Sequence, residues 1–210
     1  MFNNFTLNIN HGDFTVLIGP SGSGKTTLLK ILSGLMRFDE GDLKILNHNF
    51  SPNVYSASLF SKLRKYDLGI ITQQWNLYPN STILENFYLN YFLFKSDIRT
   101  SEIQQSESIF RKMLHSISLF YNTNRSIENL SWGEKQRLAI VLAILKHPKI
   151  ILADEPTANL DAHSAEFIID VFQYLNNQGI TIIMATHDLS LIRNGMIRIP
   201  LGKYSEQSNQ

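Results

Sequence analysis

The chain has 210 residues, with 19 Lys and Arg set against 18 Asp and Glu and no cysteine. This length suits one α/β domain with a sizeable core. Because the charges are scattered, we expect no nucleic-acid partner, and the absence of cysteine excludes disulfides and thiolate metal sites. No apolar run reaches the roughly 18 to 20 residues of a membrane span, so we expect neither a span nor a secretion signal.

The N-terminal third alternates strands with helices. Period-two alternation predicts a half-exposed strand at 5–9, and a nearly continuous apolar run predicts a buried strand at 14–18. Helical spacing begins at Lys25, and Gly34 is placed to end that helix. The remaining elements expected in this third are a strand at 42–46, a helix at 56–65 and a strand at 68–71.

The middle of the chain shows only helical patterns, and strands return after it. The expected helices are at 82–91, 102–118 and 132–145, followed by strands at 150–153 and 181–185 around a helix at 162–176. This alternation predicts a mostly parallel sheet covered on both faces. We therefore predict one domain over 1–210, with a catalytic core from 1–72 and 146–210, a helical subdomain at 73–145 and a small N-terminal antiparallel β part.

A glycine-rich segment between the strand at 14–18 and the next helix matches the phosphate-loop pattern G-x-x-x-x-G-K-[ST]. Glycines let backbone N–H groups curl around a phosphate, and the following helix presents its positive end there. Lys25 can reach the β- and γ-phosphates, and the Thr26 hydroxyl can ligate Mg²⁺. The predicted nucleotide-binding residues here are Gly19, Pro20, Ser21, Gly22, Ser23, Gly24, Lys25, Thr26 and Thr27.

Two acids, Asp154 and Glu155, follow the buried strand at 150–153. Ligands bind beyond the carboxyl ends of strands in open α/β sheets. We expect Asp154 to hold Mg²⁺ through a water and Glu155 to polarise the water that attacks the γ-phosphate. An Asp-Glu pair alone more often forms a solvated turn, but the phosphate loop upstream favours the functional interpretation.

In its motifs the chain resembles the nucleotide-binding domain of ATP-binding cassette (ABC) transporters, a P-loop NTPase with a RecA-like core. Residues 130–137, Leu-Ser-Trp-Gly-Glu-Lys-Gln-Arg, resemble the signature motif of that family, and Ser131 with Glu134 has the spacing of a capping box. By this resemblance, Ser131, Trp132, Gly133 and Glu134 meet ATP bound to a partner cassette. It also implies that Gln73 contacts nucleotide and Mg²⁺, Asp161 lies in the dimer loop, and His187 contacts the γ-phosphate as a catalytic residue with Glu155 and Lys25.

Three features depart from the family pattern. Trp132 and Glu134 replace a glycine and a glutamine of the signature, while Ser131 and Gly133 are kept, so we expect function to survive at a lower rate. Leu142 stands where many members carry arginine. Before the first strand, Phe2 is the only aromatic available to stack on adenine, and such stacking is worth about 1 to 3 kcal/mol.

The resemblance implies an ATPase that uses ATP and Mg²⁺ and pairs with a second ABC subunit as a homodimer or heterodimer. It would drive a separate transmembrane permease from the cytoplasmic face of the cell membrane. Residues 154–161 and 82–86 look like the subgroup of lipoprotein-release and macrolide exporters, and the aromatic run at 87–94 is either local core or a groove for a permease helix. The alternatives are a soluble non-transport ABC-type ATPase and a regulatory protein that holds ATP without turnover.

Overall fold

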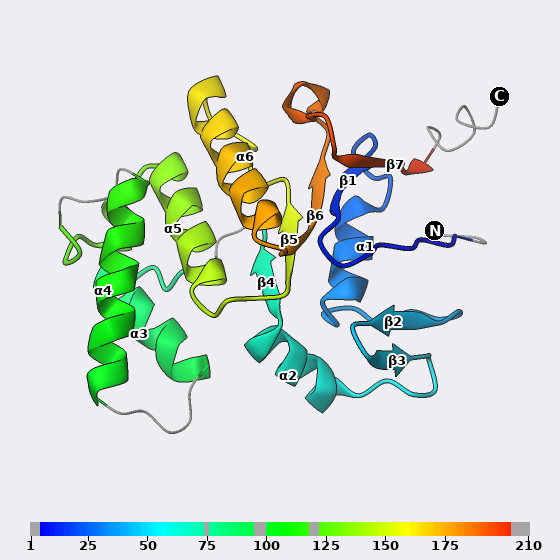
Figure 1. The fold of residues 1–210 in the computed structure, drawn as a ribbon, viewed down its shortest axis with the longest axis horizontal. Helices are drawn as coiled ribbons and strands as arrows, with labels where there is room; N and C mark the ends of the chain where they lie inside the picture. Colours follow the sequence, from blue (N-terminus) through cyan, green and yellow to red (C-terminus); the bar gives the residue numbers. More distant parts are fainter. Residues whose placement is uncertain (1–4, 74–75, 95–99, 118–121, 203–210) are drawn as a thin grey trace.

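The computed structural model describes residues 5–73, 76–94, 100–117 and 122–202. Its main sheet has five parallel strands in the order β4-β5-β6-β1-β7 (Figure 1). The strands are β1 (Phe14–Ile18), β4 (Leu68–Ile71), β5 (Ile150–Asp154), β6 (Thr181–Thr186) and β7 (Ile197–Pro200). Strands β5, β6 and β1 are neighbours in the sheet. They are far apart in the chain because parallel strands need long crossover connections.

Both faces of this sheet are buried, as its continuous apolar strands require. Val16, Ala153 and Met184 point to one face, where helices α5 (Trp132–Ile144) and α6 (Ala162–Asn177) cover them. Their neighbours Leu17 and Leu152 point to the other face and pack against α1 (Lys25–Leu32). The predicted mostly parallel, doubly covered sheet is confirmed.

A small antiparallel hairpin stands beside the main sheet. It joins β2 (Leu43–Ile45) to β3 (His48–Phe50), and the next helix, α2 (Ala57–Tyr66), packs on it. Phe50 stacks on Phe60 of α2 with ring centroids 4.1 Å apart. This hairpin is the antiparallel part that was expected, with β2 close to its predicted position and β3 not predicted.

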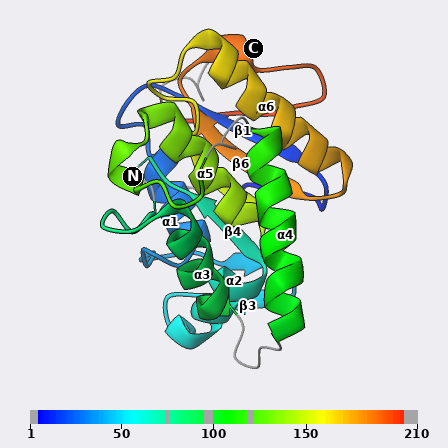
Figure 2. The same cartoon turned by 90° about the vertical axis from the view of Figure 1, so that its left-hand side faces the viewer.

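Between β4 and β5 the described residues form helices α3 (Ile83–Phe94), α4 (Thr100–Ser116) and α5, with a short 3₁₀ turn, η1 (Ile127–Asn129). Helices α3, α4 and α5 face the viewer in Figure 2, in front of the sheet. They share an apolar cluster of their own, while α5 also packs on the sheet. A capping box begins α3, since Thr82 N–H donates to Glu85 Oε2 at 2.7 Å and Glu85 N–H to Thr82 Oγ1 at 3.1 Å. Phe87 is buried and stacks on Phe110, whereas Leu89, Phe92 and Leu93 are exposed.

The segment at 5–9 and strand β7 also differ from the sequence expectations. The strand expected at 5–9 is wrong, because this segment is irregular and instead packs Leu7 and Ile9 against the α1 face of the sheet. Its alternation therefore reflects half burial without strand pairing. Strand β7 was missed, since its Arg and Pro break the apolar pattern on an edge strand. Among the described residues, no helix combines the length and the apolar character that crossing a bilayer requires.

Candidate active site

The candidate site lies at the carboxyl ends of three adjacent strands. In register, Asp154 of β5 faces Ala185 of β6, and Thr186 of β6 faces Ile18 of β1. The residues that follow these strand ends therefore gather at one edge of the sheet. Parallel pairing thus brings together the phosphate loop, the acid pair and the histidine that the sequence predicted.

The phosphate loop is closed by its glycines. Gly24, which precedes the first turn of α1, has φ 99°, and no acidic side chain lies in that first turn. A Cβ on Gly19 would lie 2.5 Å from Ser23 Oγ and 2.7 Å from the Leu201 carbonyl oxygen, so only glycine fits there. The helix N-terminus thus has free N–H groups suited to an anion.

Lys25 is nearly buried beneath this loop. Its Nζ donates to the carbonyl oxygens of Gly19 at 2.7 Å and Pro20 at 3.2 Å, and it lies 3.7 Å from Glu155 Oε1. A lysine ammonium can donate three hydrogen bonds. The side chain is therefore held at the loop and can exchange carbonyl partners for phosphate oxygens.

Thr26 and Asp154 supply paired oxygen atoms. The Thr26 hydroxyl donates to Asp154 Oδ1 at 3.1 Å, and burial raises the pKa of the Asp154 carboxyl, an effect that the bond from Thr26 opposes. Mg²⁺ prefers oxygen ligands and binds through one or two carboxylates together with substrate phosphates and waters. A hydroxyl beside a poorly solvated carboxylate fits such an ion.

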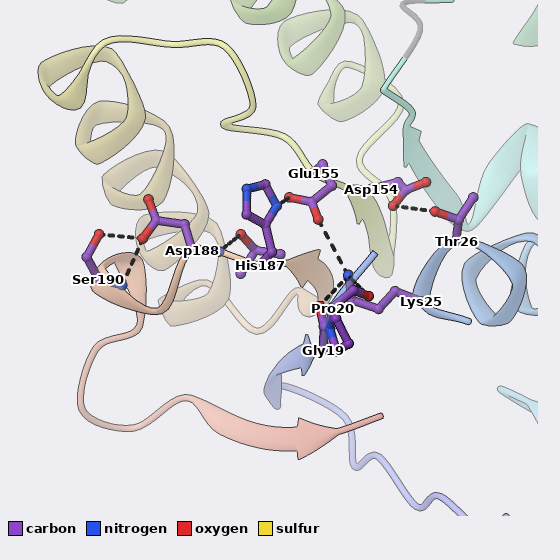
Figure 3. A network of polar contacts seen from close by, with 10 residues as sticks. Gly19, Pro20, Lys25, Thr26, Asp154, Glu155, His187, Asp188 and Ser190 are labelled. Atoms are coloured by element: carbon purple, nitrogen blue, oxygen red, sulfur yellow. Dashed lines mark hydrogen bonds and ion pairs between the residues drawn. The ribbon is translucent and has the colours of Figure 1, made fainter. Parts of the chain in front are cut away.

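Glu155 lies at the centre of the site (Figure 3). Its N–H donates to the Ala185 carbonyl at 3.0 Å, and its backbone has the left-handed φ of 48°, which is strained for a residue with a side chain. Oε2 lies 3.0 Å from His187 Nδ1, while Oε1 faces Lys25. The carboxylate thus bridges the strand end of β6 and the phosphate loop.

The other predicted residues lie apart from this cluster or at its edge. Gln73 is exposed two residues past the end of β4, next to β5 in the sheet. Ser131 caps α5, and the capping box with Glu134 is present, as expected. Asp161, implied by the resemblance to lie in the dimer loop, also caps α6, since its Oδ1 accepts the Ser164 N–H at 2.9 Å.

The signature segment, residues 130–137, contacts the Asp161 loop, residues 158–161, within one chain. A Cβ on Gly133 would lie 3.4 Å from Leu160 Cδ2, and Arg137 Nη1 lies 3.5 Å from Ser164 Oγ, whose hydroxyl donates to Asp161. Trp132 is 43% exposed at the start of α5. These two segments therefore form one surface.

Sequence reasoning missed Arg125. Its guanidinium pairs with Glu134 at 2.7 Å and also donates to the Asn129 carbonyl. The sequence places this arginine nine positions before Glu134, which is compatible with an ion pair. Whether the two side chains meet depends on the turn at η1 between them. Leu142, which stands where many members of the family carry arginine, is buried in the apolar cluster of helices α3, α4 and α5. Phe2 lies outside the described residues.

A glycine loop ahead of a helix N-terminus, with acids at the end of another parallel strand of the same sheet, is how P-loop nucleoside triphosphatases hold phosphate and metal. The fold and the site define this class here. The chain belongs to the ABC transporter family, since the family model described as "ABC transporter" matches residues 2–158. It is an ATP-binding cassette, the nucleotide-binding ATPase unit of an ABC transporter.

Relatives support this membership. The chain is 37% identical over 194 residues to the ABC transporter ATP-binding protein MJ0796 of Methanocaldococcus jannaschii, covering 91% of this chain and 81% of that protein. It is 34% identical over 208 residues to the macrolide export ATP-binding/permease protein MacB of Rhodopirellula baltica, covering 98% of this chain but only 30% of that longer protein.

A solved structure agrees in fold. The dimeric post-hydrolysis state of the ATP-binding cassette MJ0796, bound to ADP and Pi, matches with a TM-score of 0.80 at 36% identity, over 93% of this chain and 83% of that one. That relative is a dimer of cassettes. A second cassette is also the partner that the sequence of this chain predicts.

Proposed function

We propose that this chain hydrolyses ATP with Mg²⁺ in a pair of cassettes and thereby powers transport by a separate membrane subunit. The observation that carries this proposal is the Glu155 carboxylate, placed between His187 Nδ1 at 3.0 Å and Lys25 Nζ at 3.7 Å. A carboxylate so placed can accept a proton from a water next to the γ-phosphate. Lys25 would neutralise the developing charge on the phosphates.

The remaining roles follow from position. The phosphate loop amides and Lys25 would hold the β- and γ-phosphates. Thr26 and Asp154, with Gln73 at the edge, would hold Mg²⁺, which bridges phosphate oxygens and neutralises their charge when bound. His187 would orient the γ-phosphate and the Glu155 side chain.

A second cassette would complete the site. Ser131 and Gly133 lie on the surface that they share with the Asp161 loop. The phosphate loop of the same chain lies elsewhere, at the carboxyl ends of the strands. The N-terminus of α5 would receive a phosphate in the same way as that of α1. The related MJ0796 cassette is dimeric with ADP and Pi, which favours the same arrangement here.

The membrane subunit would attach between the helical part and the core. A cavity of about 200 Å³ there is lined by residues of α2, β4, α3 and α5, among them Arg64, Asn90 and Leu142. On α3, beside Asn90, the side chains of Leu89 and Leu93 are exposed. An amphipathic cytoplasmic helix could cover this apolar face. The cassette would then lie on the cytoplasmic face of the membrane.

Glu155→Gln tests the ATPase assignment. We expect phosphate release to fall by about 10² to 10⁴, the range that general-base catalysis contributes. ATP should then hold a dimer on gel filtration, whereas the wild type stays mostly monomeric without nucleotide. Glu166→Gln, an exposed acid on α6, is the matched control. Phosphate release at the wild-type rate would show that Glu155 is not the base.

Leu93→Asp tests the membrane attachment. Both Leu93 on α3 and Ile109 on α4 are exposed, so Ile109→Asp is the matched control. We expect only Leu93→Asp to lose copurification with a membrane subunit from native membranes, with the ATPase rate of the isolated chain unchanged. Equal copurification of both variants would exclude this face of α3 as the attachment site.

A further inference from the structure

Glu134 places a carboxylate at the N-terminus of α5, where a phosphate is expected to arrive. Its Oε2 accepts the Ser131 N–H at 2.7 Å, and the Ser131 hydroxyl accepts the Glu134 N–H at 3.3 Å. An acid at this position favours the helix electrostatically. A negative charge beside an incoming phosphate, however, repels it.

Arg125 meets that carboxylate from the other side. Its Nη1 lies 2.7 Å from Glu134 Oε1, and its Nη2 donates to the Asn129 carbonyl in the turn that leads to Ser131. Glu134 is 20% exposed and Arg125 41% exposed, so the pair is partly shielded from water. Both carboxylate oxygens are thus engaged, one by the helix cap and one by the guanidinium.

The backbone fixes the position of Arg125. Its carbonyl accepts the Ile83 N–H at 3.1 Å, the Ile127 N–H donates to the Ser81 carbonyl at 2.9 Å, and Thr82 pairs with Ser126 as an antiparallel bridge. The residue is therefore tied to the start of α3. Its side chain has a short, defined reach to the cap of α5.

We propose that Arg125 is a positioning residue for the second half of the ATPase site. It neutralises and holds the Glu134 carboxylate, so that Ser131 and the N-terminus of α5 can accept the terminal phosphate of ATP bound to a second copy of this chain. This inference depends on the proposed function of the paired cassettes. Arg125 does not touch the nucleotide and acts through Glu134.

A pair of substitutions tests this charge compensation. Arg125→Met leaves Glu134 charged and uncompensated, and we expect ATP-driven dimerisation in the Glu155→Gln background to weaken at least about tenfold, because close like charges across an interface are strongly unfavourable. Adding Glu134→Gln should restore most of the loss, since the amide oxygen can still accept the Ser131 N–H. A merely structural role for Arg125 predicts no such rescue.

Further readouts separate charge from folding. The loss in Arg125→Met should shrink as salt is raised, because salt screens the repulsion. Binding of a fluorescent ATP analogue to the monomer should be unchanged, kcat at saturating ATP should fall, and Arg125→Lys should keep most activity. Arg111→Met, which breaks the exposed pair with Glu107 on α4, is the matched control and should leave kcat unchanged.

The outcomes separate the two proposals. If the Glu155→Gln chain fails to dimerise with ATP, the paired-cassette function itself fails. If it dimerises, but Arg125→Met dimerises equally well or the double variant is as weak as Arg125→Met, only the role of Arg125 is overturned.

Discussion

Glu155 Oε2 lies 3.0 Å from His187 Nδ1, although 32 residues separate them in the chain. Each residue directly follows a strand, β5 or β6, and these strands are parallel neighbours. The contact therefore depends on the register of the sheet. It couples the proposed base to a side chain that is itself 67% exposed and open to a substrate.

Replacing His187 tests this coupling. We expect His187→Ala to lower kcat by about 10² or more, because the proposed base loses its orienting partner, while ATP affinity of the monomer changes little. The measurement is phosphate release against ATP concentration, together with binding of a fluorescent ATP analogue. His163→Ala, on the exposed start of α6, is the control. A normal kcat in His187→Ala would remove this histidine from the reaction.

Lys25→Ala tests the phosphate loop. We expect ATP affinity to fall at least about tenfold, since hydrogen bonds to charged groups contribute about 1.5 to 3 kcal/mol each. Equilibrium binding of a fluorescent ATP analogue measures the change. Lys30→Ala, exposed on the same helix, should bind normally. Unchanged affinity in Lys25→Ala would contradict the assignment of the whole loop.

Gly34 is a stability determinant at the end of α1. Its φ is 65°, and an added Cβ would lie 2.1 Å from Phe60 Cγ. We expect Gly34→Ala to lower the free energy of unfolding by about 2 to 4 kcal/mol, combining backbone strain with overpacking. Gly41 also has a positive φ, of 93°, but an added Cβ there would have no atom within 4 Å. Gly41→Ala should therefore lower the free energy of unfolding by only about 1 to 2 kcal/mol. Urea unfolding distinguishes the two, and equal losses would exclude the contact with Phe60.

Lys146 gives stability a pH dependence. Burial lowers the pKa of Lys146 from 10.5 to about 8, while its Nζ donates to the Arg64 carbonyl at 2.5 Å. Between pH 8 and 10.5 the unfolded chain therefore binds more protons at this residue than the folded chain, so stability rises with pH there. Below pH 8 both the folded and the unfolded chain bind this proton, so the free-energy cost of burying the Lys146 ammonium is fully present.

Lys146→Met removes this titration. The stability of the wild type relative to Lys146→Met should increase from pH 8 to pH 10 by about 1 to 3 kcal/mol. Urea unfolding at several pH values measures it, with the exposed Lys112→Met as control. If the difference in unfolding free energy between the wild type and Lys146→Met stayed constant from pH 8 to pH 10, the lowered pKa of Lys146 would be contradicted.

The sequence alone predicted which residues form the candidate site. The phosphate loop around Lys25 and the acids Asp154 and Glu155 could be singled out because each motif lies at the junction of a strand and a loop, where local spacing suffices. The caps at Ser131 and Asp161 were predictable for the same reason, since a cap joins residues only three positions apart.

Only the tertiary structure decided which of these residues meet. The order β5-β6-β1 places Glu155 beside His187 and Lys25, and no local pattern encodes strand order. Similarly, the turn at η1 brings Arg125 to Glu134, and packing against the sheet, rather than pairing, sets the conformation of residues 5–9. These contacts join residues far apart in the chain or separated by a turn, so their energies depend on a geometry that local propensity does not contain.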